Sequence, residues 1–130
     1  MFRLVKVLNS NTQCETQLIK CNSSHIVGRG CALTLTSGVA SPPAATSAPE
    51  FISLASNAEL EDTKVPAMIV TEDMVFKVEY NGNVTPTVGM TVGLGTIEYK
   101  MDSVTYSSNG KGTVIGIDED KRFVYVKFRK

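Results

Sequence analysis

Short stretches in which apolar and polar residues alternate recur along almost the whole chain. The clearest is MVFKVEY at residues 74–80, where apolar residues alternate with Lys77 and Glu79. Alternation with a period of two is typical of a β-strand that buries one face. We expect further strands of this kind at residues 2–8, 16–21, 31–36, 50–56, 65–71, 90–94, 104–106, 112–118 and 122–129.

Glycine-containing turn sequences separate many of these stretches. Asn81-Gly82 tolerates the positive φ of a tight hairpin turn, so we expect a turn directly after residue 80. Only SNAELED, residues 56–62, favours a helix, and it could form about two turns at most. The pattern predicts an all-β fold, a small barrel or sandwich of short antiparallel strands, in a single domain over residues 1–130.

One segment, SGVASPPAATSAPE at residues 37–50, interrupts the alternation. Its prolines fix φ and lack an amide donor, and the small residues between them have little side chain to bury. The segment therefore cannot form a central strand. We expect either a flexible loop or an extended arm that lies along another surface.

The overall charge argues against a protein that coats DNA. Hydrophobic residues make up 42% of the chain, and 13 Lys and Arg residues balance 13 Asp and Glu residues. A DNA-coating protein gains its affinity by neutralising phosphates, which requires a basic surface. Acidic residues predominate over residues 50–79 and basic ones over residues 110–130. This segregation fits self-association or a mixed-charge partner, and equally two solvated faces.

The chain shows no sign of membrane insertion or secretion. No apolar run approaches the roughly 20 residues of a membrane-spanning helix, so we expect no membrane partner. The first residues, MFRLVKVLNSN, carry charges where a signal peptide has its apolar core. An odd number of cysteines fits reduced thiols in a cytoplasm better than a disulfide framework.

Residues that could support catalysis or bind a metal do not form a recognisable motif. His25 is the only histidine, and the residues around it do not resemble a nucleophile elbow. Cys14, Cys21, His25 and Cys31 lack the close pair of ligands with which small zinc sites usually begin. We expect Cys31 to be a buried structural thiol. VGLG at residues 92–95 lacks the spacing of a phosphate-binding loop. We therefore predict no catalytic residue, no cofactor and no metal, and the chain is not expected to be an enzyme.

The last 22 residues, NGKGTVIGIDEDKRFVYVKFRK, read as two strands joined by an acidic turn. This hairpin is similar to the glycine–strand–turn–strand unit of KOW and SH3-like barrels. The basic and aromatic side chains of the last strand can stack on bases and contact phosphates, so one alternative is an SH3- or OB-like nucleic-acid-binding module. The acidic turn would repel phosphate, which makes nucleic acid the less favoured partner. The outward, basic and aromatic positions of the last strand are Phe123, Tyr125, Lys127 and Arg129.

The order of motifs over residues 26–130 resembles that of the small β-barrel capsid decoration (cement) proteins of tailed bacteriophages. GRGCALTLTSG corresponds to an early strand, the Pro/Ala/Thr-rich segment to a permissive segment, and TPTVGMTVGL to a later strand. GKGTVIGIDEDKRFVYVKF corresponds to the closing hairpin. The resemblance rests on strand order and on the placement of glycines.

This resemblance implies a non-enzymatic virion structural protein, made in the host cytoplasm, that binds the outer surface of a capsid and stabilises the shell. The partner would be the major capsid protein, and the decoration protein would form a homo-oligomer, for which a trimer is one option. Residues 1–10 have no counterpart in the resemblance, and with residues 37–50 we nominate them as arms that contact the shell or a neighbouring copy. The candidate shell contacts are Phe2, Arg3 and Lys6.

Overall fold

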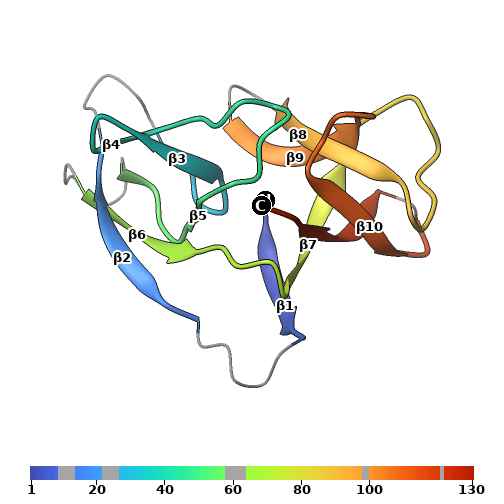
Figure 1. Cartoon of the computed structure of the whole chain (residues 1–130), viewed down its shortest axis with the longest axis horizontal. Coiled ribbons are helices and arrows are strands. Elements are labelled where there is room, and N and C mark those ends of the chain that lie inside the picture. The colour runs from blue at the N-terminus through green and yellow to red at the C-terminus, as the bar shows by residue number, and fades with distance from the viewer. Residues whose placement is uncertain (9–13, 22–26, 58–63, 98–99, 121) are drawn as a thin grey trace.

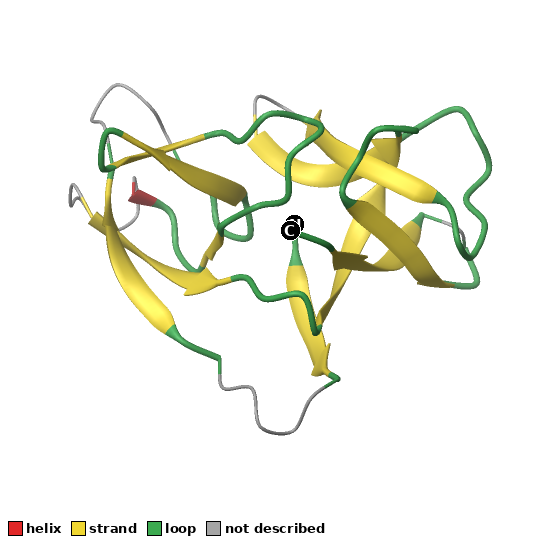
Figure 2. Ribbon diagram, viewed as in Figure 1, coloured by secondary structure: helices red, strands yellow, loops and turns green. Residues whose placement is uncertain are grey.

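The alternating stretches form β-strands, and the strands form two sheets. The computed structural model describes residues 1–8, 14–21, 27–57, 64–97, 100–120 and 122–130. The elements of this part are β-strands, so the predicted all-β class is confirmed. Figure 1 shows the barrel and the second sheet side by side, with β1 between them, and Figure 2 shows how much of the described chain is strand.

The larger sheet closes on itself. Its strands are β1 (Arg3–Val7), β7 (Met74–Tyr80), β8 (Thr91–Ile97), β9 (Lys100–Tyr106), β10 (Gly112–Ile117) and β11 (Phe123–Phe128). They lie in the order β1-β7-β11-β10-β8-β9, and β9 returns to pair with β7 in parallel. Strands β7 to β11 therefore form a closed five-stranded barrel, and β1 extends it at β7.

The second sheet packs one of its faces on the barrel. It consists of β2 (Thr16–Lys20), β3 (Ala32–Thr36), β4 (Val39–Ser41), β5 (Phe51–Ser53) and β6 (Lys64–Ile69), in the order β2-β6-β5-β3-β4. Ala32, Ile52 and Met68 on one face join the apolar core of the barrel. Leu33 and Val65 on the other face belong to a second apolar cluster. Because both faces are covered, several residues of this sheet are apolar without alternation.

The proline-rich segment is a loop after residue 41, as expected, but the short strand β4 precedes this loop. Ser37 and Gly38 have φ of 52° and 80° and join β3 to β4 in a two-residue hairpin with Thr36 opposite Val39. Two positive φ values in such a loop are the mark of a type I′ turn. Further along, Pro43 and Pro49 are buried, and the Leu94 N–H donates to the carbonyl of Ala45 at 2.9 Å. The segment lies along the protein's own barrel and ties β8 to the second sheet.

The prediction of a tight hairpin turn at Asn81-Gly82 is wrong. Strand β7 pairs with β1, β11 and β9, and the chain after it crosses to β8 without pairing back on β7. The Asn81 N–H donates to the carbonyl of Val104 in β9 at 2.9 Å. The Tyr80 hydroxyl donates to the carbonyl of Val84 at 2.5 Å. Long-range pairing thus overrides the local turn preference of Asn-Gly.

The N-terminal residues that the structure describes are not a free arm. Phe2 is 3% exposed, and its ring centroid lies 6.1 Å from that of Phe76 and 5.9 Å from that of Phe128. The Phe2 N–H donates to the backbone carbonyl of Gly30 at 2.8 Å, and the Leu8 N–H donates to the backbone carbonyl of Asp73 at 2.7 Å. The prediction of an arm over residues 1–10 is therefore wrong for residues 1–8, and residues 9–10 lie outside the described residues.

The helix-favouring stretch at residues 56–62 falls mostly on residues that the structure does not describe. In the described ranges of the chain, no helix has the length and apolar character that a membrane crossing requires.

We expect Phe2→Ala to lower the free energy of unfolding by about 3–5 kcal/mol, because it removes a buried ring and leaves a cavity in the core. The matched control is Val5→Ala on the same strand, whose side chain is 46% exposed and whose loss should cost less than about 1 kcal/mol. Urea denaturation measures both values. Equally small losses for the two variants would mean that the first strand does not pack into the core.

Candidate binding face

The outward side chains of β1, β7 and β11 gather basic and aromatic groups on one side of the barrel. Along β11, Val124, Val126 and Phe128 point into the core and are almost fully buried, so the residues between them point outward. The predicted faces of this strand are confirmed. We call the surface made by these three strands the outer face. Its members are Arg3, Lys6, Lys77, Glu79, Phe123, Tyr125 and Lys127.

Strand register places residues from distant parts of the chain in rows across this face. Arg3 lies opposite Lys77, and Lys77 lies opposite Tyr125. Glu79 lies opposite Phe123 in the adjacent row. Opposed residues in antiparallel strands share a face, with their Cβ atoms about 5 Å apart. The structure therefore brings together Arg3 and the C-terminal aromatic residues, which the sequence had suggested for two different functions.

Lys77 is the centre of the outer face. Its Nζ lies 5.3 Å from the ring centroid of Phe123 and 5.9 Å from that of Tyr125, within the range of cation–π attraction. The same Nζ lies 3.1 Å from the Asp118 carboxylate. One ammonium group thus covers two rings and is neutralised by the acidic turn that joins β10 to β11.

The ion pair between Lys77 and Asp118 shifts the pKa values of both groups. The hydrogen bond with Asp118 is the largest cause that raises the pKa of Lys77 above its ordinary value. The same hydrogen bond, followed by one from the Glu119 N–H, lowers the pKa of Asp118. A second, more exposed pair joins Arg122 to Glu79 at 3.4 Å. Two positive charges on this side of the barrel, those of Lys77 and Arg122, are therefore balanced locally.

Three cations of the outer face are not in an ion pair with any other described residue. They are Arg3, Lys6 and Lys127. A recess of about 160 Å³ lies beside Arg3, and its lining consists of Met1, Arg3, Lys77 and Phe123. Half-buried rings with an arginine at their edge are typical of protein–protein interfaces. A base that stacked on the same rings would first have to displace the Lys77 ammonium.

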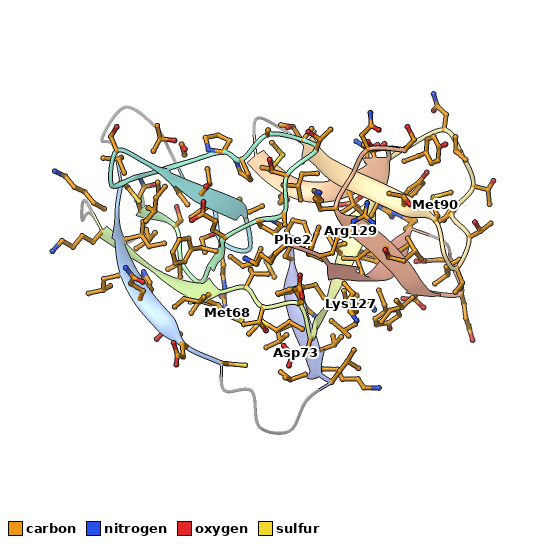
Figure 3. All side chains as sticks on the ribbon, in the orientation of Figure 1. Phe2, Met68, Asp73, Met90, Lys127 and Arg129 are labelled. Atoms are coloured by element: carbon orange, nitrogen blue, oxygen red, sulfur yellow. The ribbon has the colours of Figure 1, made fainter. Side chains whose placement is uncertain are left out.

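Two sequence-predicted site residues lie apart from this face. Phe2 is buried in the core and cannot contact a shell directly. Arg129 follows β11 and is exposed, and its N–H donates to the Lys111 carbonyl at 2.9 Å. Figure 3 shows Phe2 and Arg129 over the centre of the molecule, where the barrel meets the second sheet.

The cysteines do not gather in the described part of the chain. Cys14 is exposed, and Cys21 and Cys31 are buried. Burial raises the pKa of the Cys21 thiol, which disfavours the reactive thiolate. No group of three or more His, Cys, Asp or Glu residues that could hold a metal ion occurs among the described residues. His25 lies outside them.

Comparison of the chain with protein-family models, with curated proteins and with solved structures finds no match in any of the three.

We expect Asp118→Asn to remove a pH-dependent part of the stability. Because the folded-state pKa of Asp118 lies below its ordinary value of 3.8, the wild type gains stability from the pair above that pH and loses it as the pH falls through the lowered pKa. The raised pKa of Lys77 keeps the contribution present below 10.5, and it is lost as the pH rises through the folded-state value.

Urea unfolding of the two proteins from strongly acid to strongly alkaline pH measures this difference. Glu119→Gln is the matched control, since it removes a neighbouring exposed carboxylate that is in no ion pair with another described residue. A stability difference between wild type and Asp118→Asn that stays constant through the acid range would contradict the pairing with Lys77.

Proposed function

We propose that this protein is a non-enzymatic virion structural protein that binds the outer surface of an assembled tailed-phage capsid and stabilises the shell. Two features support the proposal. The order of strands and glycines over residues 26–130 resembles that of capsid decoration proteins, and an all-β barrel is compatible with that resemblance. A third feature, the chemistry of the outer face, is the main observation in support of the proposal.

The centre of the outer face combines aromatic surface with a paired charge, and the cations Arg3, Lys6 and Lys127 lie around it. Lys77 is held by Asp118 and lies over Phe123 and Tyr125, so the face has little net charge at its centre. Such a surface matches a protein surface of mixed charge better than a uniformly anionic polymer. The assembled lattice of a capsid offers a repeating protein surface of this kind.

The face is also rigid. Its residues stand on paired strands, and Phe2 and Phe128 anchor two of these strands in the core. A face fixed before binding loses little conformational freedom when it docks. Binding of many copies to the assembled lattice and not to free subunits would then make the lattice harder to disrupt, by mass action.

Particles of the virus that encodes this chain should contain many copies of it in a fixed ratio to the major capsid protein. Quantitative mass spectrometry of purified particles measures the ratio. Its absence from particles, while it is abundant in infected cells, would contradict the proposal.

We expect Tyr125→Ala to weaken binding of the purified protein to shells that lack it by about tenfold or more, because buried tyrosines at an interface are frequent hot spots. Val88→Ala is the control. Val88 is 67% exposed on the loop between β7 and β8, away from the outer face. Thermal unfolding of both variants would show whether each is folded. Equal affinity of the two variants would rule out the outer face as the contact surface.

A nucleic-acid-binding module is the second candidate, because Arg3 and Lys6 extend the basic surface of β11 across two more strands. If Arg3, Lys6 and Lys127 each contact a phosphate, the logarithm of the affinity for single-stranded DNA should fall against the logarithm of salt with a slope of about −2. A fluorescence titration with oligothymidylate at several salt concentrations measures the slope. No binding at low salt would remove this candidate.

A further inference from the structure

A groove separates the first strand from the second sheet. It has a volume of about 510 Å³. One wall is the backbone and side chains of residues 1–4, and the opposite wall comes from β5, the residue after it and β6. The groove therefore lies where a strand edge of the barrel faces the side of another sheet. Its lining consists of Met1, Phe2, Arg3, Leu4, Arg29, Gly30, Ile52, Ser53, Leu54 and Met68.

Beyond Phe2, the strand edge along this groove is unpaired among the described residues, and a register shift between Leu4 and Lys6 interrupts its pairing with β7. Strand β1 ends the sheet order and pairs on one side only, with β7. The Phe2 N–H points away from β7, because it donates to Gly30. Backbone groups two residues further along a strand point the same way, so those of Leu4 face the groove outside any ladder among the described residues. An open edge of this kind is a template for an added strand.

The side chains beside this edge are apolar and partly exposed. Leu54 is 37% exposed and Met1 is 41% exposed, whereas Ile52 and Met68 beneath them are buried. Leu4 is half-buried. A strand that paired with β1 would direct alternate side chains towards this apolar wall.

The charged side chains that line the groove in the described part of the chain are both positive, and the Met1 ammonium group beside them lies 4.0 Å from the Asp102 carboxylate. Arg3 and Arg29 line it and are exposed, and neither is in an ion pair with another described residue. Among the described residues, the lining contains no carboxylate. Charge complementarity therefore selects an acidic occupant.

We propose that this groove binds an extended segment of a partner protein, in which acidic residues alternate with apolar ones, as a strand added to the open edge of β1. The carboxylates contact Arg3 and Arg29, the apolar side chains cover Leu54 and Met1, and the backbone pairs with Leu4. The groove shares Arg3 with the outer face, but Arg29 and Leu54 lie outside that face, so failure of the proposed function would leave this inference standing.

A fluorescent eight-residue peptide of alternating glutamate and leucine is the probe. Fluorescence anisotropy should show saturable binding to the full chain. The same peptide with lysine in place of glutamate should bind at least tenfold more weakly, and a version N-methylated at alternate amides should not bind. On binding, the Leu4 amide should become protected from hydrogen exchange, as backbone pairing at this edge requires.

Two variants localise the site. Arg29→Glu should weaken binding of the glutamate–leucine peptide by about fivefold, as expected for an exposed charge pair turned repulsive, and Leu54→Asp should weaken it further. Arg129→Glu and Val88→Asp are the matched controls, since they make the same charge changes at exposed positions outside the groove lining.

Several results would overturn the proposal. These are the absence of saturable binding, equal binding of the acidic and basic peptides, and equal effects of Arg29→Glu and Arg129→Glu. A change in oligomeric state in Leu54→Asp, seen by analytical ultracentrifugation without a change in peptide affinity, would instead identify the groove as a contact between copies of this chain.

Discussion

The ring of Phe2 packs against Phe76 and Phe128 inside the barrel, and this contact holds the first strand in place. With β1 fixed beside β7, Arg3 is set opposite Lys77 and becomes part of the outer face. On the other edge of the first strand the Phe2 N–H donates to Gly30, and the groove lies beside the residues that follow. Both surfaces to which we assign binding therefore depend on one buried aromatic contact between the start, the middle and the end of the chain.

The contacts of Lys77 determine which class of partner the outer face can bind. Its ammonium group is paired with Asp118, whose carboxylate would repel a phosphate, and it lies over the two rings on which a base would stack. A protein partner can bind the face with this arrangement intact, since its own charges can complement a mixed surface. The hairpin turn between β10 and β11 thus supplies the Asp118 carboxylate, and its pairing with Lys77 favours a protein partner over nucleic acid.

Local pattern predicts the strands of this protein well and their partners poorly. The alternation at residues 74–80 and 122–129 identified both strands and their buried faces. The β4 strand was missed because Ser37-Gly38, a turn dipeptide between short alternating stretches, was grouped with the prolines that follow it. At Asn81-Gly82 the local sequence strongly predicts a tight hairpin turn, but β7 pairs instead with strands that are distant in the sequence. Register between strands far apart in sequence has no local signature, so the Lys77 cluster, which joins three such segments, could not be predicted.

Hydrogen exchange of the amides of the first strand tests most directly whether that strand is an integral part of the barrel. The Phe2 and Leu8 amides donate to Gly30 and Asp73, at the two ends of β1. The account predicts that both exchange as slowly as amides in the middle of β7, only through opening of the whole barrel. Exchange near the rate of an unfolded chain at Phe2 and Leu8, while β7 stays protected, would show that the segment is a free arm. It would contradict both the outer face and the groove.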